Sequence, residues 1–461
     1  MTTYRVLLPH PLESRLLMMH VHGDWRLPEW EEAATHPWQV TDHVNRAVAA
    51  RFGMETTVLR CVSARIDAES GRETRVYELE NHSAPHDMVP ASTWIGRAEL
   101  PMLAIGDPET RERIAEWFGR DAGELPVRGA VWMQRGWYIE ALAWATARLS
   151  ERGMTTHTTP EQLRCWERSF VMRIATDQGI CYFKAVPPVY GHEPALASWL
   201  ARAYPDHFPE VLAIEPDRGW LLERAVAADA LPLDEVREEE EWYRAVRRLA
   251  EIQVECSTRT HELSALGCPH RGLEILARRV PRLCADPGAF LLGEPCGLSQ
   301  SEIARVAALA PTLRTLCEEL ASYAIPDSIE HGALVASTVF SSFSGPVYVD
   351  WSSASLSHPF FSVSRIMSEA VSLVPATSRE SRRRLRDSYL VPWTAVAPHE
   401  TLVRAFEIAR VLAPVHQAAT AYAELLPASG YRWEVECAVP AAMTTALRLL
   451  ADSDSPVSIA V

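Results

Sequence analysis

The chain has 461 residues, of which 48% are hydrophobic and 23% are charged. This composition excludes a fibrous or disordered protein, and the length suggests two or three domains. The net charge of −15, from 60 acidic and 45 basic residues, disfavours nucleic acid and anionic membranes as partners. No apolar stretch is long enough for a signal peptide or a membrane span, so we expect a cytoplasmic protein.

The first 125 residues are predicted to form a domain of mixed strands and helices. The expected strands cover residues 4–10, 15–22, 56–67 and 74–83, and the expected helices cover 40–53 and 107–120. Gly53 is a typical helix stop, because glycine readily adopts the backbone conformation that ends a helix. The stretch DAGELPVRGA, residues 121–130, is predicted to be a linker.

A small sheet that carries one helix is predicted next. A long amphipathic helix is expected over 131–153, strands over 167–176, 179–188 and 210–226, and a helix over 192–204. The strand segments are rich in β-branched and aromatic residues and are bounded by polar turns, which is typical of strands.

Most of the chain after residue 230 is predicted to be helical. Apolar residues recur at spacings of three and four, which indicates amphipathic helices, over 235–256, 272–284, 298–323 and 399–426. The segment 328–367 breaks this pattern with short strand-like pieces joined by serine and glycine. Such a loop inside a helical lobe is where functional residues are expected. The arginine-rich stretches 270–279 and 379–389 are interpreted as solvated helix faces.

The nine cysteines are scattered along the chain, and their number is odd. None forms a CxxC pair, so the sequence disfavours a disulfide framework and a zinc site. We therefore predict that the cysteines are reduced and buried or half-buried thiols.

Lys184, in the segment ICYFKAVPP, is the only lysine among the 45 basic residues. A lysine differs from an arginine where a compact ammonium must act as a point charge in a tight place, for example beside phosphate oxygens. Under a plainer interpretation, one lysine survived a drift toward arginine in a GC-rich genome. The residues that follow Lys184 favour the first interpretation.

Four features follow one another along the chain: Lys184, Glu193 on the next predicted helix, EHG at 330–332 and VYVDW at 347–351. In this order and spacing they resemble the aminoglycoside phosphotransferase and choline kinase-like family, which is related to the protein kinases. Taken singly, each feature also has a structural interpretation, as a strand-edge lysine, a helix N-terminal acid or a turn residue.

The resemblance covers roughly residues 150–455 and implies a bilobal kinase-like fold that binds ATP and Mg²⁺. It implies that Lys184 contacts the α- and β-phosphates and that Glu193 holds this lysine as an ion pair. Glu223, in the segment LLERA, falls where the hinge that grips adenine is expected. Asp350 takes the position of a Mg²⁺ ligand.

The predicted catalytic loop departs from the family pattern. The family has His-Gly-Asp and then an Asn five residues after the Asp, whereas this chain has His331, Gly332, Ala333 and Thr338. Ala333 takes the position of the catalytic base, and a methyl group accepts no proton. Thr338 takes the position of a metal ligand, and a threonine hydroxyl binds Mg²⁺ in P-loops. The remaining catalytic candidates are His331, for which we favour a supporting role in the loop, and Asp350.

The N-terminal region resembles a Nudix hydrolase segment over residues 25–60, where a proline-containing turn precedes a helix. Arg46 and Gly53 fit the Nudix spacing. The positions of the metal-binding glutamates are Ala47, Ala50 and Arg51. Without carboxylates this helix would not hold the metal ions that hydrolyse diphosphates. The resemblance implies a Nudix-like fold with a binding or structural role; an unrelated α+β domain is the alternative.

The predicted fold is therefore α+β. The predicted domains are a Nudix-like domain over 1–125, a linker helix with a kinase-like N-lobe over 126–228, and a helical C-lobe with the catalytic-loop remnant over 229–461.

Two functions stay open. The first is a pseudokinase that binds Mg-ATP and acts as a scaffold or regulator of a protein partner. The second is an active phosphotransferase, or another nucleotide-dependent transferase, that acts on a small molecule or a peptide. Its base would be His331, Asp327, Glu330 or a group of the substrate. A binding module without a nucleotide is disfavoured by the retained Lys184, Glu193 and Asp350.

Overall fold

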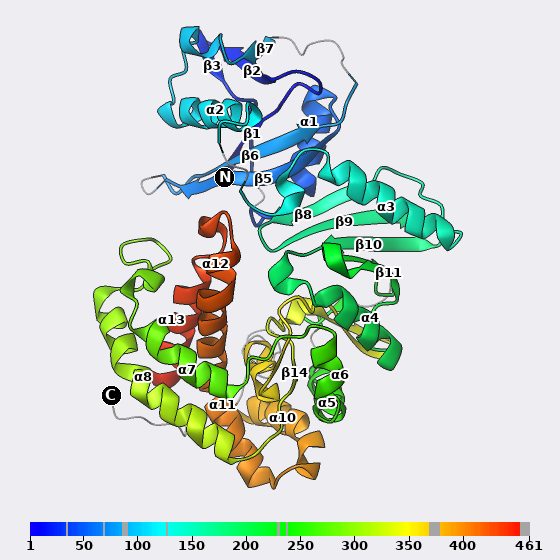
Figure 1. Ribbon diagram of the computed structural model, residues 1–461, viewed down its shortest axis with the longest axis vertical. Coiled ribbons are helices and arrows are strands. Elements are labelled where there is room, and N and C mark those ends of the chain that lie inside the picture. Colours follow the sequence, from blue (N-terminus) through cyan, green and yellow to red (C-terminus); the bar gives the residue numbers. More distant parts are fainter. Residues whose placement is uncertain are drawn as a thin grey trace. The chain divides into compact units, whose positions relative to one another are not determined.

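The computed structural model describes residues 1–33, 36–67, 70–84, 91–125, 128–227, 231–236, 238–367 and 379–451 (Figure 1). The chain divides into two compact units, Met1–Pro187 and Pro188–Val461. Each unit contains both helices and strands, so the predicted α+β class is confirmed. The predicted domain boundaries at residues 126 and 228 lie outside the described residues, and that partition stays a prediction.

The first unit begins with two sheets. One has the order β4–β1–β6–β5, in which β1 runs parallel to β6 and the other pairs are antiparallel. Its strands are β1 (Thr2–Leu7), β4 (Glu29–Glu32), β5 (Thr56–Ile66) and β6 (Glu73–Asn81). The other sheet is antiparallel and consists of β3 (Asp24–Arg26), β2 (Arg15–Val21) and β7 (Ser92–Gly96).

Two helices pack against these sheets. Helix α1 (Asp42–Phe52) ends at Gly53, which has a left-handed φ of 67°, as the sequence predicts. Helix α2 (Pro108–Asp121) buries Ile114, Trp117 and Phe118 in a core cluster with residues of both sheets. The apolar spacing of α2 therefore produces one shared core for the two sheets.

The rest of the first unit is an antiparallel meander of β8 (Glu161–Trp166), β9 (Ser169–Thr176) and β10 (Gly179–Ala185). Helix α3 (Trp137–Glu151) covers one face of this meander (Figure 1), and the rings of Trp137 and Trp144 lie 6.2 and 5.9 Å from that of Phe183. The helix begins later than predicted, because Gly136 has a φ of 84° and residues Val131–Met133 form a separate 3-10 turn.

Gln162 of β8 ties the meander to the first sheet. Its side-chain amide donates to the carbonyl of Val58 at 2.7 Å and accepts from the N–H of Val58 at 2.7 Å. Asn45 donates to the same side-chain oxygen at 2.9 Å. Val58 lies where the register between β5 and β6 shifts. The glutamine thus supplies the partner that a regular strand backbone would have supplied there.

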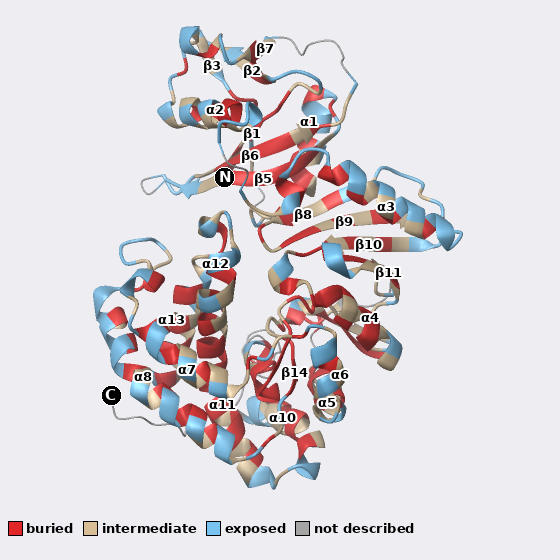
Figure 2. Cartoon of the chain, in the orientation of Figure 1, coloured by how far each residue is buried: buried red, intermediate tan, exposed pale blue. Residues whose placement is uncertain are grey.

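The second unit combines a hairpin with a mainly helical body. The hairpin is formed by β11 (Val211–Glu215) and β12 (Trp220–Arg224), and helix α4 (Glu193–Ala203) packs on it. The body contains α5 (Glu239–Ser257), α6 (Thr260–Ala265), α7 (Leu273–Cys284), α8 (Gln300–Ser322), α10 (Arg379–Leu390), α11 (His399–Thr420), α12 (Leu426–Ala428) and α13 (Ala438–Ala451). In Figure 2 the helices show alternating buried and exposed positions, as amphipathic sequences predict.

The segment predicted to break the helical pattern supplies the strands of two small sheets, except for one short strand at Leu231–Pro232. One consists of β13 (Leu231–Pro232), β15 (Val339–Ser342) and β16 (Gly345–Tyr348), and the other of β14 (Ser328–Glu330) and β17 (Ser355–Ser357). Both are antiparallel. Among the described residues, no helix has the length and apolar character needed to cross a bilayer.

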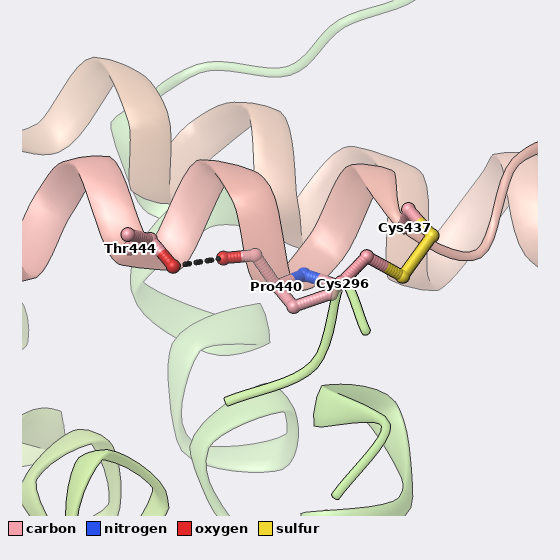
Figure 3. The surroundings of a disulfide bond; sticks show 4 residues. All are labelled: Cys296, Cys437, Pro440 and Thr444. Atoms are coloured by element: carbon pink, nitrogen blue, oxygen red, sulfur yellow. Dashed lines mark hydrogen bonds between the residues drawn. A yellow bond between two sulfur atoms is a disulfide. The ribbon is translucent and has the colours of Figure 1, made fainter. Parts of the chain in front are cut away.

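The prediction that all cysteines are reduced is wrong for one pair. Cys296 and Cys437 form a disulfide (Figure 3). The other seven are buried free thiols, as predicted. The two bonded residues are 141 positions apart, and no local spacing in the sequence signals a pairing that only the folded chain brings together.

We expect Gln162→Ala to lower the free energy of unfolding of the first unit by about 2–4 kcal/mol, because both peptide groups of the buried Val58 lose their partner. Urea-induced unfolding would measure this. Gln178→Ala is the matched control: its side chain donates to Gly153 at an exposed site, so its effect should stay within about 0.5 kcal/mol. Equal effects of the two changes would contradict the proposed role of Gln162.

Candidate functional site

The candidate site is built from two loops of the second unit. The first follows β14 and covers residues 331–338; the second follows β16 and covers residues 349–354. They meet because β14 and β17 pair antiparallel, with Glu330 opposite Ser355. The first loop therefore begins beside the point where the second loop ends.

His331, the first residue of the first loop, connects the two loops through its buried side chain. Its side chain is fully buried, and its Nε2 lies 3.1 Å from the carbonyl oxygen of Val349. Its ring centroid is 4.5 Å from that of Trp351, and its backbone N–H donates to Ser362 at 3.0 Å. Because a carbonyl oxygen only accepts, Nε2 carries the proton. This geometry agrees with a supporting role for His331 and gives its Nε2 no capacity to accept a proton.

Gly332 brings the two loops into direct contact. Its φ is 76°, and a Cβ at this position would lie 2.2 Å from the carbonyl oxygen of Ser353. Its N–H donates to Oε1 of Glu330 at 2.7 Å. Only glycine fits both the left-handed conformation and the close approach, which explains why the sequence has glycine after His331.

The family resemblance predicts that Ala333 and Thr338 take the positions of a base and a metal ligand. Ala333 is half-buried. The hydroxyl of Thr338 donates to the carbonyl of Val335 at 2.9 Å and accepts from its N–H at 3.2 Å. The threonine hydroxyl thus closes its own turn, and one lone pair is left for any further ligand. Its role as a Mg²⁺ ligand stays a prediction.

Asp350 lies two residues after the end of β16 in a strained backbone conformation. Its φ is 65°, in the left-handed region that non-glycine residues rarely adopt. Its carboxylate accepts from the hydroxyl of Ser352 at 3.0 Å. The strand before it is anchored by Tyr348, whose hydroxyl donates to the carbonyl of Ala245 at 2.6 Å. The anchored end of β16 and the left-handed backbone of Asp350 together fix the position of the Asp350 carboxylate.

Within the part of the chain that the structure describes, no three His, Cys, Asp or Glu residues gather into a metal site. A Mg²⁺ ion is commonly held by one or two carboxylates together with substrate phosphates and water. Asp350 is the right donor for such a shared site, but the protein does not supply a complete ligand cage among these residues.

Arg271 is buried beneath the second loop, which corrects its interpretation as part of a solvated basic face. Its side chain is only 3% exposed, and its Nη1 donates to the carbonyl of Ser353 at 3.0 Å. Its Nε and Nη2 donate to one oxygen of Glu424 at 3.0 and 2.7 Å, and Arg279 lies 2.6 Å from the other oxygen. Burial alone would raise the pKa of Glu424, but the two guanidinium groups outweigh it and lower that pKa.

Glu424 belongs to a π-helical segment, Ala421–Leu425, that follows α11. Single π turns within helices are frequent at functional sites. The sequence carries no signal for this ion pair, because its members lie 153 residues apart.

Glu330 and Asp327 are the two carboxylates considered as alternative bases; Glu330 is buried, whereas Asp327 is exposed. Glu330 is 2% exposed, and burial raises its pKa to about 7, although Gly332 N–H, Arg271 and Ser355 oppose this rise. Partial desolvation also raises the pKa of the exposed Asp327, against the charge of His270. A fully buried carboxylate such as Glu330 does not reach an acceptor substrate, so it is a structural part of the loop.

The remaining predicted site residues lie elsewhere in the two units. Lys184 belongs to β10 in the first unit and alternates with Phe183, so it faces away from the side that α3 covers. Glu193 is the first residue of α4 and is buried, and Glu223 lies on β12 opposite Val211. The structure thus brings together His331, Ala333, Thr338 and Asp350, while the roles of Lys184, Glu193 and Glu223 stay predictions.

No protein-family profile matches the sequence, and no curated protein matches it. Among solved structures, the chain is similar to a choline/ethanolamine kinase family protein from Mesorhizobium loti, with 14% identity over 67% of this chain and 95% of that chain and a TM-score of 0.46. Choline kinase LicA from Streptococcus pneumoniae has 13% identity over 68% and 99% of the two chains and a TM-score of 0.46. Macrolide 2'-phosphotransferase type I has 13% identity over 66% and 95% of the two chains, with a TM-score of 0.44.

These neighbours are kinases and phosphotransferases of the kind that the sequence resemblance names, and LicA has also been solved with AMP. They say nothing about a Nudix-like first domain, which stays a prediction for residues 1–125, nor about Mg²⁺ or lost catalysis in this chain.

We expect Gly332→Ala to destabilise the second unit by about 2–3 kcal/mol more than Gly293→Ala, as measured by urea-induced unfolding. The two glycines have similar φ values, 76° and 88°, but a Cβ at Gly293 meets nothing within 4 Å. The control therefore carries the conformational strain without the collision with Ser353. Equal losses would show that the loops do not pack as closely as described.

The raised pKa of Glu330 has a consequence for stability. The native state keeps its proton up to pH about 7, whereas an unfolded glutamate loses it near 4.5. The stabilisation is thus complete below pH 4.5 and is lost as the pH rises through 7, by about 3 kcal/mol. Glu330→Gln, which keeps an oxygen for Gly332 N–H, should remove this loss.

Urea-induced unfolding between pH 5 and 8 would measure the difference between Glu330→Gln and the wild type. That difference should grow with pH. Glu274→Gln is the control, because Glu274 is exposed and pairs with Arg278 on its own helix. A difference that stays constant across this pH range would contradict the burial of a protonated Glu330.

Proposed function

We propose that the chain is a kinase-like nucleotide-binding protein that holds Mg-ATP but does not carry out ordinary phosphoryl transfer, and that it acts as a pseudokinase with a scaffold or regulatory role. One observation carries this proposal. The two candidate loops are tightly held around Asp350 by His331, Gly332 and Arg271, yet the base position between them carries only the methyl group of Ala333.

The proposal gives each predicted residue a role in holding the nucleotide. Lys184 contacts phosphate oxygens as a point charge, and Glu193 orients it. Asp350 binds Mg²⁺ together with the phosphates, with the hydroxyl of Thr338 as a weaker neighbour. Glu223 belongs to the segment that contacts the base of the nucleotide.

Two of the candidate bases, His331 and Glu330, are buried and do not replace the missing base. The Nε2 of His331 donates to Val349, and Glu330 is buried with its oxygens on Gly332 and Ser355. General-base assistance contributes about 10²–10⁴-fold to a rate, and an aspartate at this position also orients the acceptor. Its absence supports nucleotide binding without rapid transfer.

Thermal unfolding with and without Mg-ATP tests the proposal. Nucleotide at about 100 times its Kd should stabilise the wild type by about 2.7 kcal/mol, or roughly 5–10 °C in Tm. Lys184→Ala should lose this shift, and Lys184→Arg should lose most of it, because a planar guanidinium does not replace a compact ammonium in a tight site. The Tm of each variant without nucleotide is the control for folding.

Asp350→Asn should reduce the shift with Mg-ATP more than the shift with ATP and EDTA, because it removes the charge that holds the metal. Absence of any shift in the wild type, even at millimolar nucleotide, would overturn the proposal. Transfer of labelled phosphate to an acceptor, lost in Asp350→Asn, would instead favour the active transferase.

A further inference from the structure

The disulfide joins two structural elements that are distant in sequence. Cys296 lies in the short loop Leu291–Leu298 that precedes α8, and Cys437 lies directly before α13 (Figure 3). The carbonyl of Cys437 accepts the first helical hydrogen bond, from Ala441 N–H at 3.1 Å. The disulfide therefore fixes the start of α13 to this loop.

The two bonded cysteines are also the accessible ones. Both are half-buried, whereas the other seven cysteines are buried. The loop that carries Cys296 is closed by a hydrogen bond from Leu298 N–H to the carbonyl of Phe290 at 2.9 Å. A Cβ on Gly297 would lie 1.8 Å from the carbonyl oxygen of Leu291, so only glycine permits this turn. The closed loop holds Cys296 in place. Because Cys296 is only half-buried, a thiol reductant has the access to its sulfur atom that disulfide exchange requires.

The loop of Cys296 is connected to the π-helical segment Ala421–Leu425. Asp286 begins the 3-10 turn before the loop and accepts from Gly288 N–H at 3.0 Å. Its other oxygen accepts from the hydroxyl of Tyr422 at 2.8 Å. Tyr422 is two residues from Glu424, the carboxylate that holds Arg271.

Helix α13 contacts the same π-helical segment and packs lengthwise against α11. Its buried face contains Val439, Met443 and Leu447, and α11 continues into Ala421–Leu425 without a break. The disulfide therefore joins two elements, the Cys296 loop and α13, that both brace the position of Glu424.

Glu424 in turn reaches the candidate site in one step. It holds Arg271 through two hydrogen bonds, and Arg271 donates to the carbonyl of Ser353. Ser353 is the residue on which Gly332 packs, three positions after Asp350. A shift of Glu424 thus moves the residue that holds the Asp350 loop.

We propose that the Cys296–Cys437 disulfide is a redox switch that regulates the candidate nucleotide site, with the oxidised form holding the Asp350 loop in place and the reduced form loosening it. The effect on nucleotide affinity rests on the function proposed above, whereas the effect on the loop does not. The partner in the exchange is a dithiol reductant.

The thiol–disulfide exchange proceeds in two steps. A thiolate of the dithiol attacks the Sγ of Cys296, the protein S–S bond breaks, and Cys437 leaves as a thiolate that takes up a proton. The N–H groups at the start of α13 stabilise this developing charge. The second thiol of the reductant then attacks the mixed disulfide and releases Cys296 as a thiol. Two electrons and two protons pass to the protein, and the dithiol becomes a disulfide.

Hydrogen exchange of the full-length protein, with and without dithiothreitol, tests the switch. A thiol assay in denaturant should count seven thiols before reduction and nine after it, given one disulfide and seven free cysteines. Reduction should speed the exchange of residues 350–356 and 421–428 by about fivefold. It should weaken Mg-ATP binding by about fivefold, a typical coupling between distant sites.

Two variants sharpen this test. Cys296→Ser with Cys437→Ser should behave like the reduced protein and should not respond to dithiothreitol. Tyr422→Phe keeps the disulfide but removes the bond to Asp286, so reduction should change its loop exchange less than in the wild type. If the double variant does not fold, reduction of the wild type still provides the comparison.

The outcomes separate the two proposals. Nine thiols before reduction, or exchange at residues 350–356 that does not change on reduction, would overturn the switch. Faster exchange on reduction, in a protein that binds no nucleotide in either state, would support the switch and reject the proposed function.

Discussion

The second unit depends on the contact between Gly332 and the carbonyl group of Ser353. A Cβ on residue 332 would lie 2.2 Å from that oxygen, so the two loops pack more closely than any other residue permits. The short separation lets His331 reach Val349 and Trp351 from below. It also places Asp350, in its left-handed conformation, at the end of an anchored strand. A strained residue persists only where its surroundings over-determine it, and these contacts are the surroundings of Asp350.

Buried charge supports the same loops. Arg271 and Glu424 form an ion pair below the second loop, and Arg279 occupies the second carboxylate oxygen. Desolvating such a pair is unfavourable unless its hydrogen bonds are satisfied, and here the guanidinium also donates to Ser353. The contribution of the pair is therefore geometric: it fixes where Ser353 lies. Glu330 also fixes loop positions through its hydrogen bonds, because its oxygens accept from Gly332 and Ser355. Burial raises its pKa to about 7, which favours its protonated form.

Local patterns predicted the elements well, because apolar spacing and turn residues act over a few positions. The helix that ends at Gly53, the strand of Lys184 and the irregular segment after residue 328 all lie where the sequence indicates. The pattern break marked the segment that contains the His331 and Asp350 loops, and the family resemblance singled out these two residues within it. The disulfide and the buried Arg271 were missed, because their partners lie 141 and 153 residues away. The contact of Gln162 with the backbone of Val58 was not predicted for the same reason, because the two residues lie 104 positions apart.

One carbonyl group links the supports of the site. The oxygen of Ser353 accepts from Arg271 and lies against Gly332. The two contacts therefore share one position, and a movement of Arg271 displaces the oxygen on which Gly332 packs. Because Glu424 sets the position of Arg271, a change in the C-terminal helices reaches the His331 and Asp350 loops through a single peptide group. Under the proposed function, in which Ala333 takes the base position without supplying a base, these supports fix where Asp350 lies and so serve regulated binding rather than transfer chemistry.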